Sequence, residues 1–342
     1  MKLTIILPAY NVESIINETI QAICNQSFKD WELIAIDDGS QDNTYELLQR
    51  FSENDSRIQV IKQKNQGYRS VRNRGIENAR GKYITFIDSD DIIDDNFLEN
   101  LVSLMESKKS DLIISGYKKI TEGGRIVGEV KYKNCESNNP LEDIGLRMIG
   151  SDPSASDSIM PVVWSNCYKT SIILENNIRF IDSKNIPSED LVFNLEYLNC
   201  IKRAHVSSIV GYYYRLSSGS ITRKLSREKI FIHAEMIGIL KNTWKNKFSD
   251  REAFKNRLEM NFLIGLRGDL FRKSEEENVL QLLKHHSQVF RDKNINAIIS
   301  EIEMQKYSFS RKIFIVIIKC RMTFLTVLAS VLLNMKSHYR SK

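Results

Sequence analysis

The sequence predicts an α/β protein in which a mostly parallel sheet flanked by helices is followed by a helical extension. Three observations lead to this prediction. Short apolar, β-branched runs alternate with stretches of helical periodicity through the first 90 residues. Three of these runs end directly in polar, turn-forming motifs. From about Arg227 onward the pattern is helical and carries no obvious chemistry.

The first expected element is a buried strand over residues 3–7, which ends at Pro8. Apolar residues then recur at helical spacing from Val12 to Ile23, and Asn11 is placed to cap that helix. Strands joined by helices in this way build a parallel sheet with right-handed crossovers. The remaining elements predicted for this region are a strand at 32–36, a helix opening at 42–44, a strand at 58–61, a helix at 69–79 and a strand at 83–87.

Later segments are less regular. Residues 116–140 are polar, and Gly123-Gly124 predicts a hairpin turn, so we expect an insertion or edge strands there. After residues 161–164 come an acidic turn at 188–190, a helix to about Cys200 and a strand that ends at 211–215.

The bulk composition excludes several classes of protein. With 42% hydrophobic and 27% charged residues the chain is an ordinary folded protein. Its net charge of +6 lies in the tail, because eight basic and two acidic residues follow from Glu301 onward and the rest holds 41 of each. A nucleic-acid-binding domain would carry its excess on the folded body, so we expect no nucleic-acid partner. Five scattered cysteines without a CxxC pair indicate a reducing compartment, and the first residues enter a strand with no apolar signal segment.

Asp88-Ser89-Asp90 is the first candidate site. It places two carboxylates on one side of an extended segment at a strand end, where they can share a hard divalent cation. Bridging a diphosphate leaving group with that cation would neutralise the charge that builds as the bond breaks. The alternative is a solvated turn that caps a helix beginning near Asp94. Because Pro8–Asn11 and Asp37–Ser40 also follow strands at the same sheet edge, we expect one cleft there.

The other candidates have both a functional and a structural explanation. Asp38 can accept hydrogen bonds from a uracil-type base or a ribose, or it can serve the turn alone. Pro8 to Asn11 can form a floor for the base with Tyr10 available for stacking, or it can be an ordinary loop. Gly67, Arg69 and Arg72 lie at the start of a helix, where phosphate is favoured, or they can belong to an exposed surface.

Transfer with inversion requires a base on the face opposite the leaving group. Glu189-Asp190 is the best candidate pair. The alternative is an ordinary acidic pair that the dipole of the following helix stabilises.

These motifs, in this order, resemble the family 2 glycosyltransferases with the GT-A fold, a Rossmann-like architecture, and in particular bacterial enzymes of surface polysaccharide assembly. The resemblance is dense over residues 2–97 and sparse to about Arg223. The matching motifs are Leu7-Pro8-Ala9-Tyr10-Asn11, Asp37-Asp38-Gly39-Ser40 with Asp42, Asn65-Gln66-Gly67, Arg72-Asn73-Arg74-Gly75-Ile76, Ala79-Arg80-Gly81-Lys82-Tyr83-Ile84 and Phe86-Ile87-Asp88-Ser89-Asp90-Asp91.

The resemblance implies metal-dependent, inverting transfer of a hexose or N-acetylhexosamine from a UDP-sugar to a glycan or lipid-linked acceptor, with Mn²⁺ or Mg²⁺ as cofactor. It implies that Asp38 contacts the base, that Asp90 ligates the metal with Asp88 beside it, and that Asp190 is the base with Glu189 in support. The competing hypothesis is a non-catalytic nucleotide-sugar-binding or scaffold protein. The full set expected at the donor is Pro8, Tyr10, Asn11, Asp38, Gly67, Arg72, Asp88, Ser89, Arg215 and Arg223.

Residues 214–215 and 220–223 resemble the segment with which the family covers the diphosphate. Some relatives supply a His to the metal there, whereas this chain has three tyrosines at 212–214. A nucleotidyltransferase, the third possibility, would need a Gly-rich phosphate loop near the N-terminus, and the sequence has none.

The expected organisation is a catalytic domain over 1–225, with a nucleotide half to about 115 and an acceptor half after it, a helical extension over 226–305, and a basic tail over 306–342. The tail's apolar stretch at 313–333 is interrupted by Lys319 and Arg321, which disfavours a spanning helix. We expect peripheral attachment to the inner face of the cell membrane, where a lipid-linked acceptor would be found. A helix buried in a homodimer is the alternative.

Overall fold

The computed structural model describes the chain except residues 155, 182–187, 217–226, 272–277 and 339–342. The chain divides into two compact units. Unit 1 comprises Met1–Gly145, Pro161–Asp182 and Ser188–Lys224, and unit 2 comprises mainly Leu146–Met160 and Leu225–Lys342. The start of unit 2 at Leu225 lies next to the boundary proposed from sequence, but unit 2 also takes in residues 146–160.

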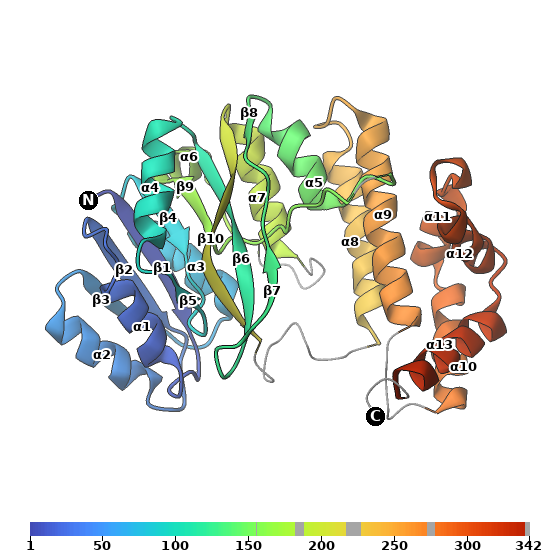
Figure 1. Cartoon of the computed structure of the whole chain (residues 1–342), viewed down its shortest axis with the longest axis horizontal. Coiled ribbons are helices and arrows are strands. Elements are labelled where there is room, and N and C mark those ends of the chain that lie inside the picture. Colours follow the sequence, from blue (N-terminus) through green and yellow to red (C-terminus); the bar gives the residue numbers. More distant parts are fainter. Residues whose placement is uncertain (155, 182–187, 217–226, 272–277, 339–342) are drawn as a thin grey trace. The chain divides into compact units, whose positions relative to one another are not determined.

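Unit 1 is built on a ten-stranded sheet whose main path runs β3-β2-β1-β4-β9-β6-β10-β5, with β7 beside β6 and β8 beside β10 (Figure 1). The strands β3, β2, β1 and β4 are mutually parallel, and β9, β5, β7 and β8 pair antiparallel with their neighbours. The α/β class is therefore confirmed, and the parallel strands lie mainly in the N-terminal half. Their bounds are β1 Leu3–Ala9, β2 Trp31–Asp37, β3 Ile58–Lys62, β4 Tyr83–Phe86, β5 Ile92–Ile93, β6 Leu112–Thr121, β7 Ile126–Val130, β8 Cys135–Ser137, β9 Asn166–Lys169 and β10 Ala204–Leu216.

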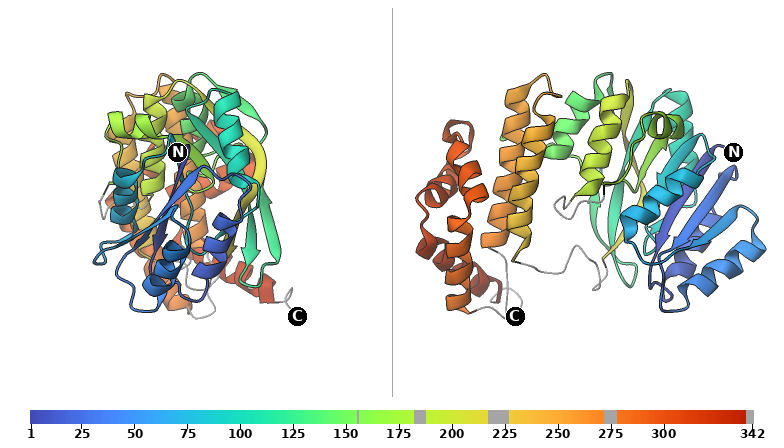
Figure 2. Two further views of the ribbon diagram at one scale, coloured as in Figure 1. Left: turned by 90° about the vertical axis from the view of Figure 1, so that its left-hand side faces the viewer. Right: turned by 180° about the vertical axis from the view of Figure 1, so that it is seen from behind.

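Helices cover both faces of the sheet (Figures 1 and 2). Alternate residues of β1 and β2 face α1 (Ile16–Cys24), α2 (Thr44–Asn54) and α4 (Phe97–Ser107) in one large core. The other alternate residues face α3 (Tyr68–Asn78), and a Cβ on Gly75 would lie only 2.4 Å from a methyl carbon of Ile6. Burial on both faces explains why these strands read as continuous apolar runs. The remaining helices of unit 1 are η1 Leu141–Gly145, α6 Thr170–Glu175 and α7 Glu189–Cys200.

Three local features bear on the sequence predictions. The expected cap at Asn11 is wrong, because α1 begins at Ile16 and Asn11 has a positive φ of 51°. The Asp88-Ser89-Asp90 motif is followed by the two-residue strand β5. Helix α4 therefore begins at Phe97, three residues later than the helix start considered near Asp94. The expected hairpin turn is confirmed, because β6 and β7 pair antiparallel around Gly124, whose φ is 78°.

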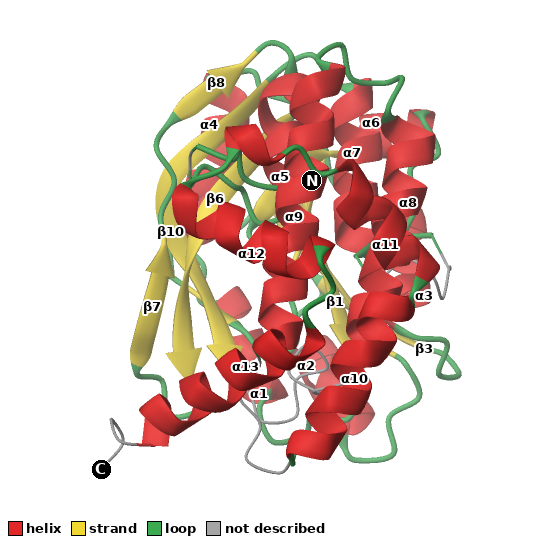
Figure 3. Cartoon of the chain, turned by 90° about the vertical axis from the view of Figure 1, so that its right-hand side faces the viewer, coloured by secondary structure: helices red, strands yellow, loops and turns green. Residues whose placement is uncertain are grey.

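Unit 2 is helical. It contains α5 Leu146–Ile149, α8 Lys229–Trp244, α9 Arg251–Leu270, α10 Val279–Arg291, α11 Lys293–Glu301, η3 Met304–Lys306, α12 Phe309–Lys319 and α13 Thr323–His338. Helix α9 packs on α8 and α5, and α13 packs on α10 (Figure 3). Arg321, with a φ of 51°, separates α12 from α13. Among the helices described, none is both long enough and apolar enough to cross a membrane.

Candidate active site

The loops that follow β1 and β2 are joined by hydrogen bonds at the carboxyl edge of the sheet. The backbone N–H of Asn11 donates to Ser40 Oγ at 3.0 Å, and that of Gln41 donates to Asn11 Oδ1 at 2.8 Å. Asn11, whose φ is positive, uses its side chain in this contact and does not cap α1. Pro8 lies within β1, and the Tyr10 side chain is 46% exposed. An aromatic ring is therefore accessible at this edge.

Asp38 is buried and organises the loop before α3. Its Oδ1 accepts from the backbone N–H of Gln66 at 3.0 Å and from Gln63 Nε2 at 2.8 Å, and its Oδ2 accepts from the N–H of Gly67 at 2.8 Å. Gly67 has a φ of 84° and is the N-cap of α3. The Asp38 carboxylate therefore fixes where α3 begins. The sequence prediction did not include Gln63, which acts on Asp38 from the end of β3.

The segment after β4 holds three aspartates with different surroundings. Thr19 Oγ1 donates to the carbonyls of Ser89 and Asp91, at 3.0 and 2.8 Å, and so fixes the backbone. The Asp88 side chain is 28% exposed. Burial and the negative charge of Asp88 raise the pKa of Asp90 to about 6.

This donor set fits a hard divalent cation, because two carboxylates that repel each other would both be stabilised by one positive ion. No cluster of three or more metal-ligating side chains occurs among the described residues. Asp88 and Asp90 are therefore the residues that would hold the ion, with the diphosphate and water as the other ligands.

Asp91 is the functional neighbour that sequence reasoning missed. It is fully buried, its Oδ2 accepts from the Tyr212 hydroxyl at 2.7 Å, and its Oδ1 accepts from the N–H of Arg215 at 2.8 Å. Burial and the nearby aspartates raise its pKa well above the usual value. The Tyr212 hydroxyl also accepts from the backbone N–H of Asp88 at 3.2 Å. Asp91 thus ties the end of β10 to the acidic motif.

Arg215 lies against the acidic motif, and its role in binding the donor stays a prediction. Its Nε donates to the carbonyl of Asp90 at 2.9 Å and its Nη2 to Glu18 at 2.6 Å. The neighbouring tyrosines have structural partners, since Tyr213 donates to Asp94 and the Tyr214 ring stacks on Trp164. Arg223 lies outside the described residues.

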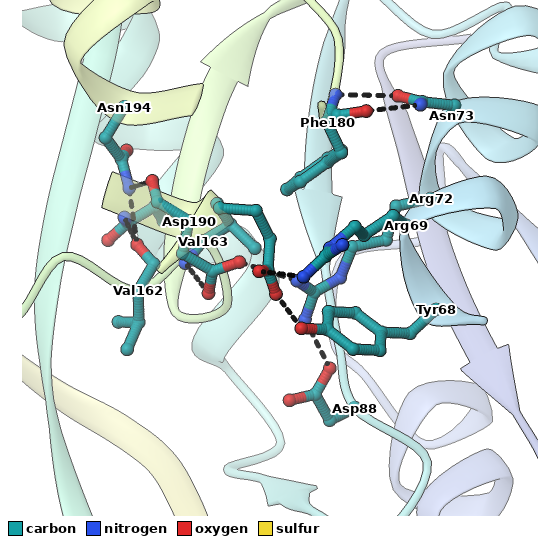
Figure 4. A network of polar contacts seen from close by, with 12 residues as sticks. Tyr68, Arg69, Arg72, Asn73, Asp88, Val162, Val163, Phe180, Asp190 and Asn194 are labelled. Carbon is teal, nitrogen blue, oxygen red and sulfur yellow. Dashed lines mark hydrogen bonds and ion pairs between the residues drawn. The ribbon is translucent and has the colours of Figure 1, made fainter. Parts of the chain in front are cut away.

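Arg72 joins the two halves of the candidate site (Figure 4). Its guanidinium is buried, with Nη2 at 3.1 Å from Asp88 Oδ1 and Nη1 at 2.7 Å from Asp190 Oδ1. The rings of Tyr68 and Phe180 each lie 5.3 Å from the guanidinium carbon. One arginine therefore pairs with a carboxylate of the predicted metal motif and with the predicted base.

Asp190 lies in the first turn of α7, where the helix dipole favours a negative charge. Its Oδ2 accepts from the N–H of Val163 at 3.3 Å, and Asn194 Nδ2 donates to both its backbone carbonyl and that of Val162. Burial raises the pKa of Asp190 while Arg72 opposes that shift. Its side chain is 19% exposed, so it remains accessible to a substrate proton.

Glu189 is held by the first turn of α3. It accepts from the Tyr68 hydroxyl and, at 3.1 Å, from Arg69 Nη2. Burial and the charge of Asp190 raise the pKa of Glu189 to about 7. Arg69 was a candidate from the sequence, and Tyr68 was not. Tyr68 could have been found from its position one turn before Arg72 on the same helix. The first turns of α3 and α7 thus form one charged cluster.

The comparisons with known proteins identify the family of the chain. The family model described as Glycosyl transferase family 2 matches residues 4–151. The glycosyltransferase GlyG of Streptococcus pneumoniae is 30% identical over 224 residues, which cover 65% of this chain and 73% of GlyG. A longer glycosyltransferase of the same species is 29% identical, and the match spans only 32% of its length.

Two solved structures share the fold. TarS 1–349 of S. aureus in complex with UDP-GlcNAc has a TM-score of 0.65 at 18% identity, covering 100% of this chain and 93% of that one. A mannosyltransferase from Pyrobaculum calidifontis in complex with GDP-Man and Mn²⁺ has a TM-score of 0.54 at 12% identity, covering 98% of this chain and 87% of that one. These likenesses identify the architecture of the chain as the GT-A type.

Proposed function

The chain belongs to the family 2 glycosyltransferases, and from this premise we propose that it is an inverting, metal-dependent enzyme that uses a UDP-sugar donor. The observation that carries the proposal is the single buried arginine, Arg72, between Asp88 and Asp190. Its Nη2 pairs with Asp88, a carboxylate of the expected metal site, and its Nη1 pairs with Asp190, the expected base.

On the donor side, Asp90 and Asp88 would hold Mn²⁺ or Mg²⁺, which supplies Lewis-acid assistance to the departing diphosphate. Asp38 fixes the loop that begins α3, and the N-terminus of that helix, capped by Gly67, would favour a phosphate group. Tyr10 offers a ring for the base. In this proposal Arg215 fixes the backbone of the acidic motif through the carbonyl of Asp90.

On the acceptor side, Asp190 takes the proton of the acceptor hydroxyl. The hydroxyl oxygen attacks the anomeric carbon, the bond from that carbon to the diphosphate oxygen breaks, and its electron pair leaves with UDP. The raised pKa of Asp190 makes its carboxylate a stronger base than an exposed aspartate. Attack from the face opposite the leaving group inverts the anomeric configuration.

The substrates belong to the same proposal. The fold shared with TarS, solved with UDP-GlcNAc, supports a UDP-hexose or UDP-N-acetylhexosamine donor. We propose a glycan or lipid-linked acceptor in bacterial surface polysaccharide synthesis, with the enzyme at the cytoplasmic face of the membrane. The described residues include all five cysteines, and no disulfide joins any of them. The alternative function is a non-catalytic sugar-nucleotide-binding protein.

The test is a screen of UDP-glucose, UDP-galactose and their N-acetyl forms for UDP release with a glycan acceptor. We expect release with Mn²⁺ or Mg²⁺, loss of release with EDTA, and loss in Asp90→Asn. The control Asp95→Asn changes an exposed aspartate of the same segment and should leave release unchanged. Release that EDTA and Asp90→Asn both leave intact would refute the metal-dependent mechanism. UDP binding without release from any donor would favour the non-catalytic alternative.

A further inference from the structure

Helix α13 of unit 2 turns apolar side chains to solvent and polar ones inward. Phe324 is 71% exposed, and Leu325, Leu328 and Leu332 are 44 to 55% exposed. Thr326 and Ser330, on the same helix, are 1% exposed or less. At about 100° per residue the four apolar side chains fall on one stripe and the two polar ones on the opposite side. This is the reverse of a helix that packs its apolar face on a core.

The orientation of α13 is fixed by polar contacts inside unit 2. Thr326 Oγ1 lies 2.9 Å from Nδ1 of the buried His286 on α10, and it donates to the carbonyl of Thr323 at 2.8 Å. Val327 is buried beside it. Rotating the helix to bury the leucines would break the contact between Thr326 and His286 and expose Val327. The apolar stripe therefore faces outward as part of the folded structure.

Helix α12 has an exposed apolar stripe of its own. Phe309, Ile313 and Val316 recur at helical spacing and are 80, 47 and 42% exposed, whereas Ile315 and Ile318 are fully buried on the inner side. By the same angular spacing, Lys312 and Lys319 both lie along one side of the outer stripe. We name the exposed apolar side chains of the two helices the tail surface: Phe309, Ile313, Val316, Phe324, Leu325, Leu328 and Leu332.

The charge around the tail surface has one sign. From Met304 to the last residue the sequence has no aspartate or glutamate and has eight lysines and arginines. Lys319 and Arg321 are exposed beside the two helices. A second copy of the chain docked on this surface would bring these cations against one another, which disfavours a symmetric dimer. An anionic surface is complementary to them.

We propose that the tail surface binds an anionic lipid bilayer, with α12 and α13 lying in its interface. The apolar stripes enter the boundary between headgroups and acyl chains, and the flanking lysine side chains reach back to the headgroup phosphates. Each cation near an anionic membrane contributes about fivefold to the partition coefficient. This binding is independent of the proposed transfer reaction, since no residue of the tail surface belongs to the candidate active site.

The experiment is flotation of the full-length chain with vesicles of phosphatidylcholine alone or with 30 mol% (about a third) phosphatidylglycerol, an anionic fraction that gives a strong surface potential. We expect binding to the anionic vesicles, at least about tenfold weaker binding to the neutral ones, and weakening in high salt.

Two variants test the two components of the surface. Leu325→Glu with Leu328→Glu should reduce binding to anionic vesicles at least about tenfold, because charge replaces the inserted side chains. Lys312→Gln, Lys319→Gln and Arg321→Gln together should reduce it about 100-fold while leaving the apolar stripes intact. The matched control is Ile264→Glu with Leu280→Glu, which makes the same change at exposed apolar residues of α9 and α10. Circular dichroism and the melting temperature verify that each variant is folded.

Three results would overturn the proposal: wild-type protein that stays unbound with anionic vesicles, a control pair that loses as much binding as the α13 pair, or a lipid-free dimer that Leu325→Glu with Leu328→Glu converts to a monomer. The last result would assign the tail surface to a second copy of the chain. If the α13 pair does not fold, the three-cation variant tests the proposal by itself.

Discussion

The candidate active site of unit 1 and the tail surface of unit 2 break opposite rules of burial. In the first, charged side chains are buried, as with Arg72 and Glu189. In the second, large apolar side chains are exposed, as with Phe324 and Leu328. The buried charges have their partners within the chain, at distances of 2.7 to 3.1 Å for the arginine pairs. The exposed apolar residues are in contact with solvent, and the helices that carry them do not cover them.

This difference separates two kinds of function. A site whose buried charges are paired within the chain is already organised before any ligand binds. Single substitutions therefore disturb it directly. A surface whose apolar groups face outward is compensated only when a partner covers it. Substitutions there should change binding and leave folding almost untouched.

The largest effect is expected from Asp190→Asn. Removing the base should lower the transfer rate by about 10²- to 10⁴-fold, because a positioned base contributes that much. Binding of UDP should change far less, since Asp190 lies on the acceptor side of the proposed reaction. The measurement is the initial rate of UDP release together with UDP titration by calorimetry.

Glu196→Gln is the matched control for that variant, because Glu196 is an exposed acid on the same helix. It should retain the wild-type rate. An Asp190→Asn enzyme with an undiminished rate would refute the assignment of the base.

Arg72→Lys should have the next largest effect. Lysine keeps the charge, but it has a single nitrogen and cannot pair with both Asp88 and Asp190 as the planar guanidinium does. We expect about a tenfold loss of affinity for UDP with Mn²⁺, measured by calorimetry. Arg72→Lys should also lower the rate of UDP release. In the double variant with Asp190→Asn the two losses of rate should not add, with a coupling of about 0.5 to 3 kcal/mol.

Arg80→Lys is the control for this comparison, since Arg80 pairs with the buried Glu32 away from the site. Its effect on the rate of UDP release should be small and additive with that of Asp190→Asn. If the losses for Arg72→Lys and Asp190→Asn are additive too, the shared arginine does not couple donor and acceptor sides.

The two faces of α13 should differ in their effect on stability. Thr326→Val removes the buried hydroxyl that contacts His286 and should lower the free energy of unfolding by about 1 kcal/mol. Leu328→Ser, on the outer face, should change it by less than about 0.5 kcal/mol. Denaturant unfolding measures both. A larger loss for Leu328→Ser would mean that the outer stripe serves folding, and the comparison between the two regions would fail.

The last comparison concerns the pH dependence of stability, which should have opposite signs in the two units. Burial raises the pKa of Glu189 to about 7, so its contribution is complete below about 4.5 and is lost as the pH rises to 7. Burial lowers the pKa of His286 to about 4, so its contribution is lost as the pH falls from about 6.5 to 4. Glu189→Gln should flatten the first slope and His286→Gln the second, in melting temperatures measured from pH 4 to 8. A variant that leaves its slope unchanged would contradict the assignment.

The N-terminal fold was predictable because its signals are local. The periodicity of apolar residues between Leu3 and Phe86 predicted every strand and helix that the structure has there, with shifts of a few residues at the ends. Strand β5 was not predictable, since two isoleucines form a strand only because β10 pairs with them. The cap at Asn11 failed because the Asn11 side chain accepts from the N–H of Gln41, thirty residues away.

The candidate site was predictable as separate motifs and not as a network. Asp88 was a candidate from its position at a strand end and Asp190 from its position at a helix start. The resemblance to the family then gave Asp190 the role of base. The arginine that joins them belongs to a third element, and its contact with Asp190 spans 118 residues of sequence. Asp91 belongs to the matching motif, but its contacts could not be predicted, because its burial against Tyr212 depends on the return of β10 to the sheet.

The left-handed conformation of Arg321 has a consequence for length. Without it, an uninterrupted helix from Phe309 to His338 would be a rod of about 45 Å, longer than the hydrocarbon core of a bilayer, which is about 30 Å. With it, the same stretch is two cylinders of 11 and 16 residues. A residue with no tolerance for positive φ, such as valine or isoleucine, would oppose the break. One backbone angle thus determines whether this end of the chain is compact or extended.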